Sequence, residues 1–268
     1  MSKSYSTVRG MRDFLPLELS KRHFVEAKVR ECFRFFGYME IETPIIESHA
    51  LIAAKSGNEI RHRLFAFTDF SGRKLALRPE LTASVARVVT NKLRTRPKPI
   101  RLGYIANCFR YDNPQLGRYR EFWQAGFEMF GSEYPVSDAE IVLANLDLMR
   151  RVGLSEAFLK IGHVGILRAI LNTYKVPESE QNKIMGFVDG SRHDQVKKTF
   201  TELKIPAEGQ DAIQRLFALK GAQPNIFEQG EIILEKYPHA QKALSNLQTI
   251  VSLVQQSTVP NNISVDLG

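Results

Sequence analysis

The segment CFRYDNPQLGRYREFWQAGFE, residues 108–128, constrains the fold of this chain more than any other stretch. Apolar and aromatic residues lead into and out of a turn marked by Pro114 and Gly117, the pattern of two strands joined by a loop. We expect an antiparallel hairpin with strands at 100–110 and 121–131 and a long cationic tip. Because arginines and carboxylates crowd beside aromatic surface here, the hairpin is the first candidate for a binding site.

One face of the second strand carries the polar chemistry of the hairpin. Residues two apart in a strand share a face, so Gln124, Gly126 and Glu128 are predicted to line one side. The side that carries Trp123 is expected to be the packed one, and Arg110 can reach the polar side if the hairpin closes in this register. The alternative is an ordinary solvent-facing sheet, in which cross-strand pairs contribute a few tenths to about 1 kcal/mol each.

Composition excludes several classes of protein. A chain of 268 residues, 43% hydrophobic and 25% charged, can bury a real core in one large or two smaller domains. Its apolar runs fall short of the roughly 20 residues that cross a bilayer, so no membrane partner is expected. The N-terminus lacks the apolar core of a signal peptide, which predicts a cytoplasmic protein. Cys32 and Cys108 lie far apart and the histidines show no ligand spacing, so no protein-held metal site is expected.

Charge is distributed unevenly along the chain. The net charge is +8, and between Arg61 and Arg120 there are fourteen lysines or arginines but three acidic residues. One interpretation is a solvated basic face that keeps the protein soluble. The other is a surface for polyanions such as nucleotide phosphates or an RNA backbone, which release counterions on binding. Charge alone leaves both open.

The remaining pattern divides the chain into a mixed part and a helical part. Apolar periodicity predicts helices at 24–36 and 81–93, a strand at 38–44 and a hairpin at 64–77. Ser137 and Glu140 form an S-x-x-E capping box, which predicts a helix that begins there and runs to about residue 151. Helical segments follow at 165–174, 178–188, 191–203, 210–219, 226–236 and 240–256, and residues 263–265 alternate as in a strand.

Several motifs, taken in order, resemble those of a known enzyme family. RGMRDFLP (9–16), FFGYMEIETPIIES, LALRPELTASVAR, FRYDNPQLGRYREFWQAGFEMFG and SDAEIV follow one another between about residues 8 and 152. Together they resemble the catalytic core of class II aminoacyl-tRNA synthetases, and specifically histidyl-tRNA synthetases of archaeal type. The resemblance implies an α+β fold, in which an antiparallel sheet is flanked by helices and carries a helical insertion.

The resemblance assigns residues to the nucleotide side of a site. Adenylation joins an amino-acid carboxylate to the α-phosphate of ATP, so negative charge builds on phosphorus, and a fixed guanidinium suits it. Arg110 matches the family's arginine in this role, and Arg118 matches an arginine over the nucleotide phosphates. Asp112 stands where the family usually carries glutamate against the adenine amino group. ATP chemistry implies Mg²⁺, held mainly through the phosphates.

The resemblance also assigns an amino-acid pocket and an RNA contact. Glu80 in RPE matches the carboxylate that receives the substrate α-ammonium, with Thr82 and Gln124 nearby. Glu128 matches the acid that completes histidine binding, and Gln115 at the hairpin tip matches a contact to the tRNA acceptor end. No general base is required, because the attacking carboxylate is already ionised.

The implied function is that of a histidine–tRNA ligase, which activates histidine with ATP and transfers it to tRNA-His as a homodimer through motif 1, the segment ending at Pro44. The expected domains are a catalytic core at 1–160, a helical insertion at 161–260 and a returning strand at 261–268. Because the sequence stops before motif 3 and the anticodon-binding domain, we expect the chain alone to be poorly stable or poorly active.

The alternative is a non-catalytic paralogue that acts as the regulatory subunit of ATP phosphoribosyltransferase in histidine biosynthesis. Such relatives tend to carry Asp at the position of Glu80, so the RPE sequence favours the synthetase. No P-loop GxxxxGK[ST] is present, which argues against a Walker-type ATPase. No RRM, KH or OB signature is present either, which argues against a generic RNA-binding domain.

Overall fold

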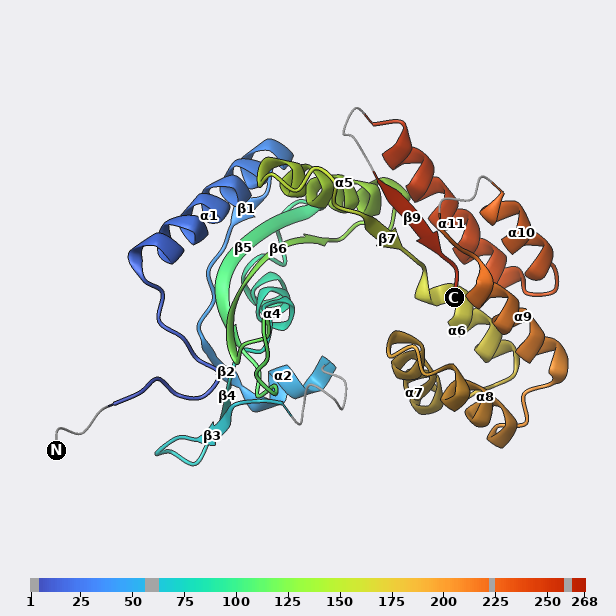
Figure 1. The fold of residues 1–268 in the computed structure, drawn as a ribbon, viewed down its shortest axis with the longest axis horizontal. Coiled ribbons are helices and arrows are strands. Elements are labelled where there is room, and N and C mark those ends of the chain that lie inside the picture. Colours follow the sequence, from blue (N-terminus) through green and yellow to red (C-terminus); the bar gives the residue numbers. More distant parts are fainter. Residues whose placement is uncertain (1–4, 56–62, 222–224, 258–261) are drawn as a thin grey trace. The chain divides into compact units, whose positions relative to one another are not determined.

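The computed structural model describes residues 5–55, 63–221, 225–257 and 262–268. The chain forms two compact units, Met1–Glu133 and Tyr134–Gly268, and each is a structural body of its own (Figure 1). The domain boundary predicted at residue 260 lies outside the described residues, and the one at residue 160 stays a prediction.

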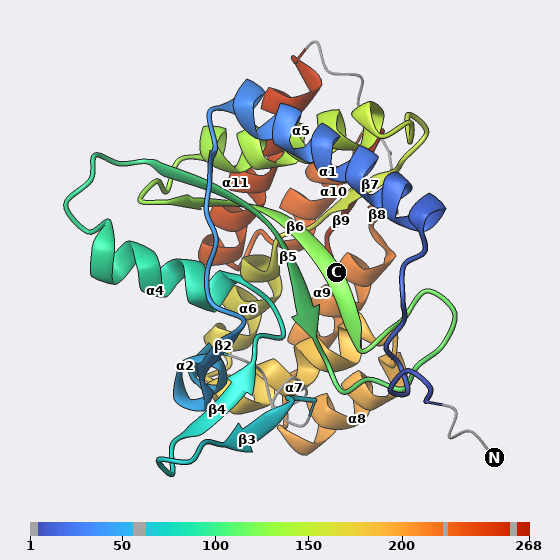
Figure 2. The same cartoon turned by 90° about the vertical axis from the view of Figure 1, so that its left-hand side faces the viewer.

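A long antiparallel hairpin forms the centre of the first unit. β5 (Ile100–Phe109) and β6 (Glu121–Phe130) pair along their whole lengths, and the short β1 (Met39–Glu40) runs parallel to β5. The predicted hairpin is therefore confirmed to within one residue at each strand end. Figure 2 shows both strands with the long loop that joins them.

Helix α1 (Pro16–Phe36) covers one face of the hairpin, on the outer side of the curved strands in Figure 1. Phe33 packs edge-to-face on Phe127, with ring centroids 5.1 Å apart. Gly103 of β5 makes this approach possible, since a Cβ there would lie 2.6 Å from the Phe33 ring. The predicted end at residue 36 is confirmed, and Gly37 after it has a left-handed φ of 72°, whereas the helix begins at Pro16 instead of residue 24.

Helix α4 (Thr82–Lys92) covers the opposite face of the hairpin. Val85 joins Leu102 and Cys108 of β5 in one buried cluster. The face that carries Trp123 is packed, as predicted. The opposite face is packed too, which was not predicted, because β5 covers it with apolar side chains. The polar residues of β6 therefore lie beside an apolar cluster rather than in open solvent.

A smaller antiparallel sheet, in the order β2–β4–β3, completes the first unit. It consists of β2 (Ile46–Ser48), β3 (Ala66–Thr68) and β4 (Lys74–Leu77), and α2 (His49–Lys55) follows β2. The β3–β4 hairpin confirms the prediction, and its turn is fixed by Asp69, whose carboxylate accepts the N–H groups of Ser71 and Arg73 at 2.9 Å. The strand predicted at 38–44 is reduced to β1, because the chain leaves the β5 edge before Pro44.

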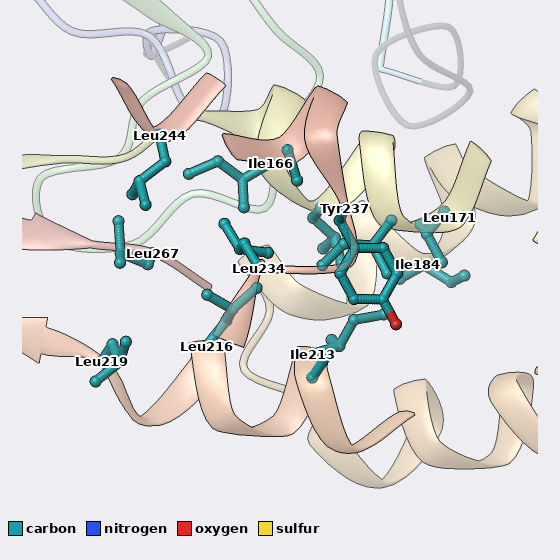
Figure 3. Close-up of a cluster of buried hydrophobic side chains, with 14 of the residues drawn as sticks. Ile166, Leu171, Ile184, Ile213, Leu216, Leu219, Leu234, Tyr237, Leu244 and Leu267 are labelled. Carbon is teal, nitrogen blue, oxygen red and sulfur yellow. The ribbon is translucent and has the colours of Figure 1, made fainter. Parts of the chain in front are cut away.

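The second unit is mainly helical, and the helices predicted between residues 165 and 256 are confirmed. Its helices are α5 (Pro135–Arg151), α6 (Val164–Thr173), α7 (Glu178–Asp189), α8 (His193–Glu202), α9 (Ala207–Ala218), α10 (Ile226–Ile233) and α11 (Pro238–Gln255). Figure 3 shows side chains from α6, α7, α9 and α11 gathered in one core, which includes Ile166, Ile184, Ile213 and Leu244. Each of these side chains is fully buried, so apolar packing holds this unit together.

A three-stranded sheet in the second unit joins distant parts of the sequence. β9 (Ile263–Asp266) lies between β7 (Leu159–Ile161), to which it is parallel, and β8 (Lys220–Gly221), to which it is antiparallel. The strand predicted at 263–265 is confirmed, whereas β7 and β8 were not predicted. Asp266 carries the sheet's charge pairs, accepting from Lys160 at 3.0 Å and lying 3.3 Å from Lys220.

The capping box predicted at Ser137 was wrong. Helix α5 begins two residues earlier, with Tyr134 at the N-cap and Pro135 in the first turn, so Ser137 lies inside the helix. Proline is well suited to the first helical position because the N–H it lacks would have no partner there. Among the described residues, no helix is both long and apolar enough to span a membrane.

Candidate active site

The β5–β6 register brings the predicted pocket residues to one face of the hairpin. Gln124, Gly126 and Glu128 lie opposite Ala106, Tyr104 and Leu102, respectively. Directly opposed residues of an antiparallel pair point to the same side of the sheet. This side is the one that α4 covers, so the first residues of that helix meet the polar edge of β6.

A carboxylate with two hydroxyl donors forms the best-defined part of this face. The Thr82 hydroxyl, in the first turn of α4, donates to Glu128 Oε1 at 2.7 Å. The phenol of Tyr104 donates to the same oxygen over 3.5 Å. Burial raises the pKa of Glu128, the nearby Glu80 charge raises it further, and the two donors oppose the shift.

Gly126 is what allows the Tyr104 ring to reach Glu128. The two residues are paired across the strands, and a Cβ at position 126 would overlap the Tyr104 ring and its hydroxyl. The glycine therefore lets the phenol lie flat across β6 instead of being pushed away from the sheet. Burial, followed by the charge of Glu128, raises the pKa of Tyr104 well above its usual range, so the phenol stays a hydrogen-bond donor.

The raised pKa of Glu128 predicts how stability depends on pH. The unfolded chain loses this proton near pH 4, roughly the value of a free glutamate, whereas the folded protein holds it to higher pH. Between those values the unfolded state binds fewer protons, so the free energy of unfolding falls as pH rises through the raised pKa. In Glu128→Gln this contribution is absent. We expect the stability of wild type minus that of the variant to fall as pH rises from about 4 to 8 in urea titrations.

Trp123 is the single tryptophan and lies in the first unit, so its fluorescence reports the relevant unfolding step. A stability difference that stays constant or rises over this pH range would contradict a raised pKa for Glu128.

Gln124 lies one step further along the same face. Its side-chain oxygen accepts a hydrogen bond from the Cys108 thiol at 3.4 Å. Burial raises the pKa of Cys108 to about 11, so the thiol stays protonated and serves as a weak donor. Glu80, in the turn before α4, is close enough for its charge to raise the pKa values of Glu128, Tyr104 and Cys108.

Arg110 begins the loop that follows β5. Its Nε donates to the carbonyl of Pro79 at 2.9 Å, and its Cζ lies 5.0 Å from the centroid of the Phe122 ring. The bond to Pro79 ties the arginine to the turn that carries Glu80. Within the described residues, the terminal nitrogens of Arg110 make no hydrogen bond, so this edge of the guanidinium can receive a ligand oxygen.

Asp112 pairs with two arginines in the structure. The Asp112 carboxylate is buried, 3.1 Å from Nε of Arg118 and 3.3 Å from Nη1 of Arg63. The pairing with Arg118 was not foreseen, because each residue was assigned separately to the nucleotide. Gln115 is exposed and closes the tip with Arg118 through two backbone hydrogen bonds around Gly117, whose φ is 78°.

Sequence reasoning missed Arg78, a buried arginine whose charge acts on Cys108 at the site. This arginine is 3% exposed, and its guanidinium donates to the Thr43 carbonyl at 2.7 Å, the Asn107 carbonyl at 2.8 Å and Asn107 Oδ1 at 3.0 Å. It therefore joins β5 to the end of β4 and to the chain before β2. Burial lowers the pKa of Arg78, but an arginine remains charged at neutral pH. The sequence signal that could have identified Arg78 is a charged residue placed between Leu77 and Pro79.

Potential metal ligands do not gather in the described part of the chain. It holds no group of three or more His, Cys, Asp or Glu side chains placed to bind a metal ion. These described residues therefore offer no protein-built metal cage. An ion carried mainly by phosphate oxygens needs no such cage.

Comparison with known proteins identifies the family. A family model described as histidyl-tRNA synthetase matches residues 10–268. The chain belongs to the histidyl-tRNA synthetase family. Curated relatives named histidine–tRNA ligase include that of Methanocaldococcus jannaschii, 42% identical over 97% of the chain and 62% of the relative, and that of Archaeoglobus fulgidus, 40% identical over 90% and 58%. The chain thus spans less than two thirds of these relatives' length.

Solved structures place the chain in the same fold. A protein from Bacillus halodurans, described as an ATP phosphoribosyltransferase regulatory subunit/histidyl-tRNA synthetase, superposes with a TM-score of 0.87, with 26% identity over 100% of the chain and 69% of that protein. The apo histidyl-tRNA synthetase of Staphylococcus aureus gives 0.53, with 31% identity over 76% and 50%. The α+β fold of histidyl-tRNA synthetases that the sequence predicted is therefore confirmed.

Proposed function

We propose that this chain provides the histidine- and ATP-binding core of a histidine–tRNA ligase. The observation that carries the proposal is one hairpin with two kinds of ligand group. A half-buried Glu128, held by Thr82 and Tyr104, lies on β6, and Arg110 with an open guanidinium edge lies at the end of β5. Family membership supports the same assignment.

On the amino-acid side, the carboxylates are the natural partners of histidine. Glu128 retains a second oxygen, Oε2, that can accept a hydrogen bond from the imidazole, while Thr82 and Tyr104 occupy Oε1. Glu80 offers a carboxylate for the α-ammonium, and Gln124 offers an amide beside it. Two acidic groups near one apolar cluster favour a cationic ligand, since their mutual repulsion is relieved when it binds.

On the nucleotide side, the proposed reaction needs no proton transfer from the protein. A carboxylate oxygen of histidine forms a bond to the α-phosphorus of ATP, and the bond from that phosphorus to the pyrophosphate oxygen breaks. Negative charge grows on the phosphoryl oxygens, and Arg110 stabilises it through a guanidinium fixed by Pro79 and Phe122. Arg118 and Asp112 contribute to the nucleotide site as a pair rather than as separate groups.

When bound, Mg²⁺ neutralises phosphate charge. Such an ion would be held mainly through the phosphate oxygens of ATP.

The proposed partners are tRNA-His and a second copy of the chain. Gln115 and the exposed Leu116 stand at the hairpin tip, where a tRNA acceptor end would be contacted. The motif 1 region and the two residues after Pro44 carry large apolar side chains that are 44–68% exposed, namely Phe35, Met39, Ile45 and Ile46. Surface of this kind is typical of a protein interface, which supports a homodimer through this region.

A second candidate function rests on one specific likeness. The Bacillus halodurans protein carries the description of a phosphoribosyltransferase regulatory subunit beside that of the synthetase. A regulatory subunit would use the same histidine pocket without the chemistry. Glu80 and the open edge of Arg110 favour the synthetase, because a pocket that only senses histidine needs no cation aimed at a phosphate.

The test is histidine-dependent ATP–pyrophosphate exchange, run beside calorimetric titration of histidine. Exchange that requires histidine, at the low rate expected of this chain alone, is the expected result. Histidine binding without any exchange would reject the catalytic proposal for this chain and favour the regulatory function. Absence of both would reject the pocket itself.

A further inference from the structure

The segment before α1 runs beside the loop between β5 and β6 (Figure 2), and backbone hydrogen bonds of Arg120 connect the two. The backbone N–H of Arg120 donates to the carbonyl of Gly10 at 2.8 Å. Its own carbonyl accepts the N–H of Arg110 at 2.9 Å. The residue just before β6 is therefore bonded on one side to the N-terminal segment and on the other to the proposed catalytic arginine.

The side chain of Arg120 makes a second set of connections. Its Nε donates to the carbonyl of Asp112 at 3.1 Å and its Nη1 to the carbonyl of Arg9 at 3.4 Å. Its Cζ lies 3.8 Å from the centroid of the Tyr111 ring. Among the residues that the structure describes, no carboxylate pairs with Arg120, so this cation is used on carbonyl oxygens and an aromatic face.

Gly10 is required for this approach. Its φ is 86°, a conformation that other residues rarely adopt, and a Cβ there would lie 2.7 Å from Cγ of Arg120 and 3.0 Å from Cγ of Pro114. The glycine in RGMRDFLP thus fits against the loop at two points, Pro114 near its middle and Arg120 at its end. The term loop clamp denotes Gly10 and Arg120 together with the hydrogen bonds that join residues 9–10 to residues 110–120.

We propose that Gly10 and Arg120 are positioning residues for the nucleotide side of the site. The loop clamp fixes the backbone of Arg110 and Asp112, while Arg63 and Arg118 fix the Asp112 carboxylate. Because the long exposed loop is already held in this way, its cations can bind phosphate without a loss of conformational entropy at the time of binding. This last step rests on the proposed function, whereas the clamping of the loop does not.

Hydrogen exchange with mass spectrometry tests the clamp without any ligand. In Arg120→Ala and Gly10→Ala, amides of residues 110–119 are expected to exchange about 10–100-fold faster, because hydrogen bonds to a charged donor are lost or displaced. Arg120→Lys keeps the charge but not the planar fork, so it is expected to loosen the loop as well. In these variants the amides of the β3–β4 hairpin should exchange at the wild-type rate. Arg73→Ala, which removes an exposed arginine from that hairpin, is the matched control and should leave exchange at 110–119 unchanged.

Unchanged exchange at 110–119 in both variants would overturn the clamp. Equal loosening of β3–β4 would overturn it too, by showing a general loss of stability instead of a local one.

Calorimetric titration with Mg-ATP tests the positioning role. Affinity for ATP is expected to fall about tenfold in Arg120→Ala and Gly10→Ala, while affinity for histidine, whose pocket lies along β6, is unchanged. A loosened loop with full ATP affinity would overturn the positioning role. If wild type binds no ATP, the proposed function fails, and hydrogen exchange still decides whether the loop is clamped.

Discussion

Arg110→Ala is expected to lower histidine-dependent ATP–pyrophosphate exchange by about 10²–10³, the usual effect of removing one preorganised donor to a developing oxyanion. The guanidinium is held by the Pro79 carbonyl and stacked on Phe122, so its open edge is already oriented before ATP arrives. An alanine removes both the charge and the two parallel donors that suit a phosphoryl group. The measurement is the exchange rate relative to wild type at equal enzyme concentration.

Two variants separate this effect from loss of structure. Arg110→Lys keeps a cation without the planar fork, so its exchange rate is expected to lie between those of wild type and the alanine variant. Arg73→Ala removes an exposed arginine that pairs with Asp69 in the β3–β4 turn, and it should exchange like wild type. Histidine affinity should survive in all three variants. A loss of less than about tenfold in Arg110→Ala would show that another group stabilises the transition state.

Most of the fold could be predicted from the sequence because its elements carry strong periodic signals. Alternation around Pro114 and Gly117 predicted the β5–β6 hairpin, and the apolar spacing at 24–36 predicted α1 and its end. The other parts of the fold could not be predicted because their contacts join segments that are far apart in the sequence. β7 and β9 are about a hundred residues apart, and no local pattern indicates that two short segments so distant will pair.

The site was predicted as a set of positions but not as a set of contacts. Period-two alternation placed Gln124, Gly126 and Glu128 on one face, and the register confirms that face. It could not show that the Tyr104 ring lies over Gly126, because this depends on which residues oppose each other. The pairing of Asp112 with Arg118 was missed for a related reason, since it depends on how a loop folds back on itself.

Arg78→Met is expected to cost the first unit about 3–4 kcal/mol of unfolding free energy, a large effect for one substitution. Methionine fills similar volume but donates no hydrogen bond. The carbonyls of Thr43 and Asn107 and the Asn107 side chain would each lose their bond to a buried cation. Losses within one network are not simply additive, so the total is less than three separate charged hydrogen bonds would give.

The test of Arg78→Met must report the first unit alone, because two compact units can unfold separately. Urea unfolding followed by Trp123 fluorescence meets this condition, since that tryptophan packs on Phe14 within the first unit. Arg73→Met is the matched control, an arginine that is 73% exposed, and it should change stability by no more than about 0.5 kcal/mol. If Arg78→Met cost about as little, the guanidinium would be dispensable for the fold, and its burial beside the site would then have to serve the ligand.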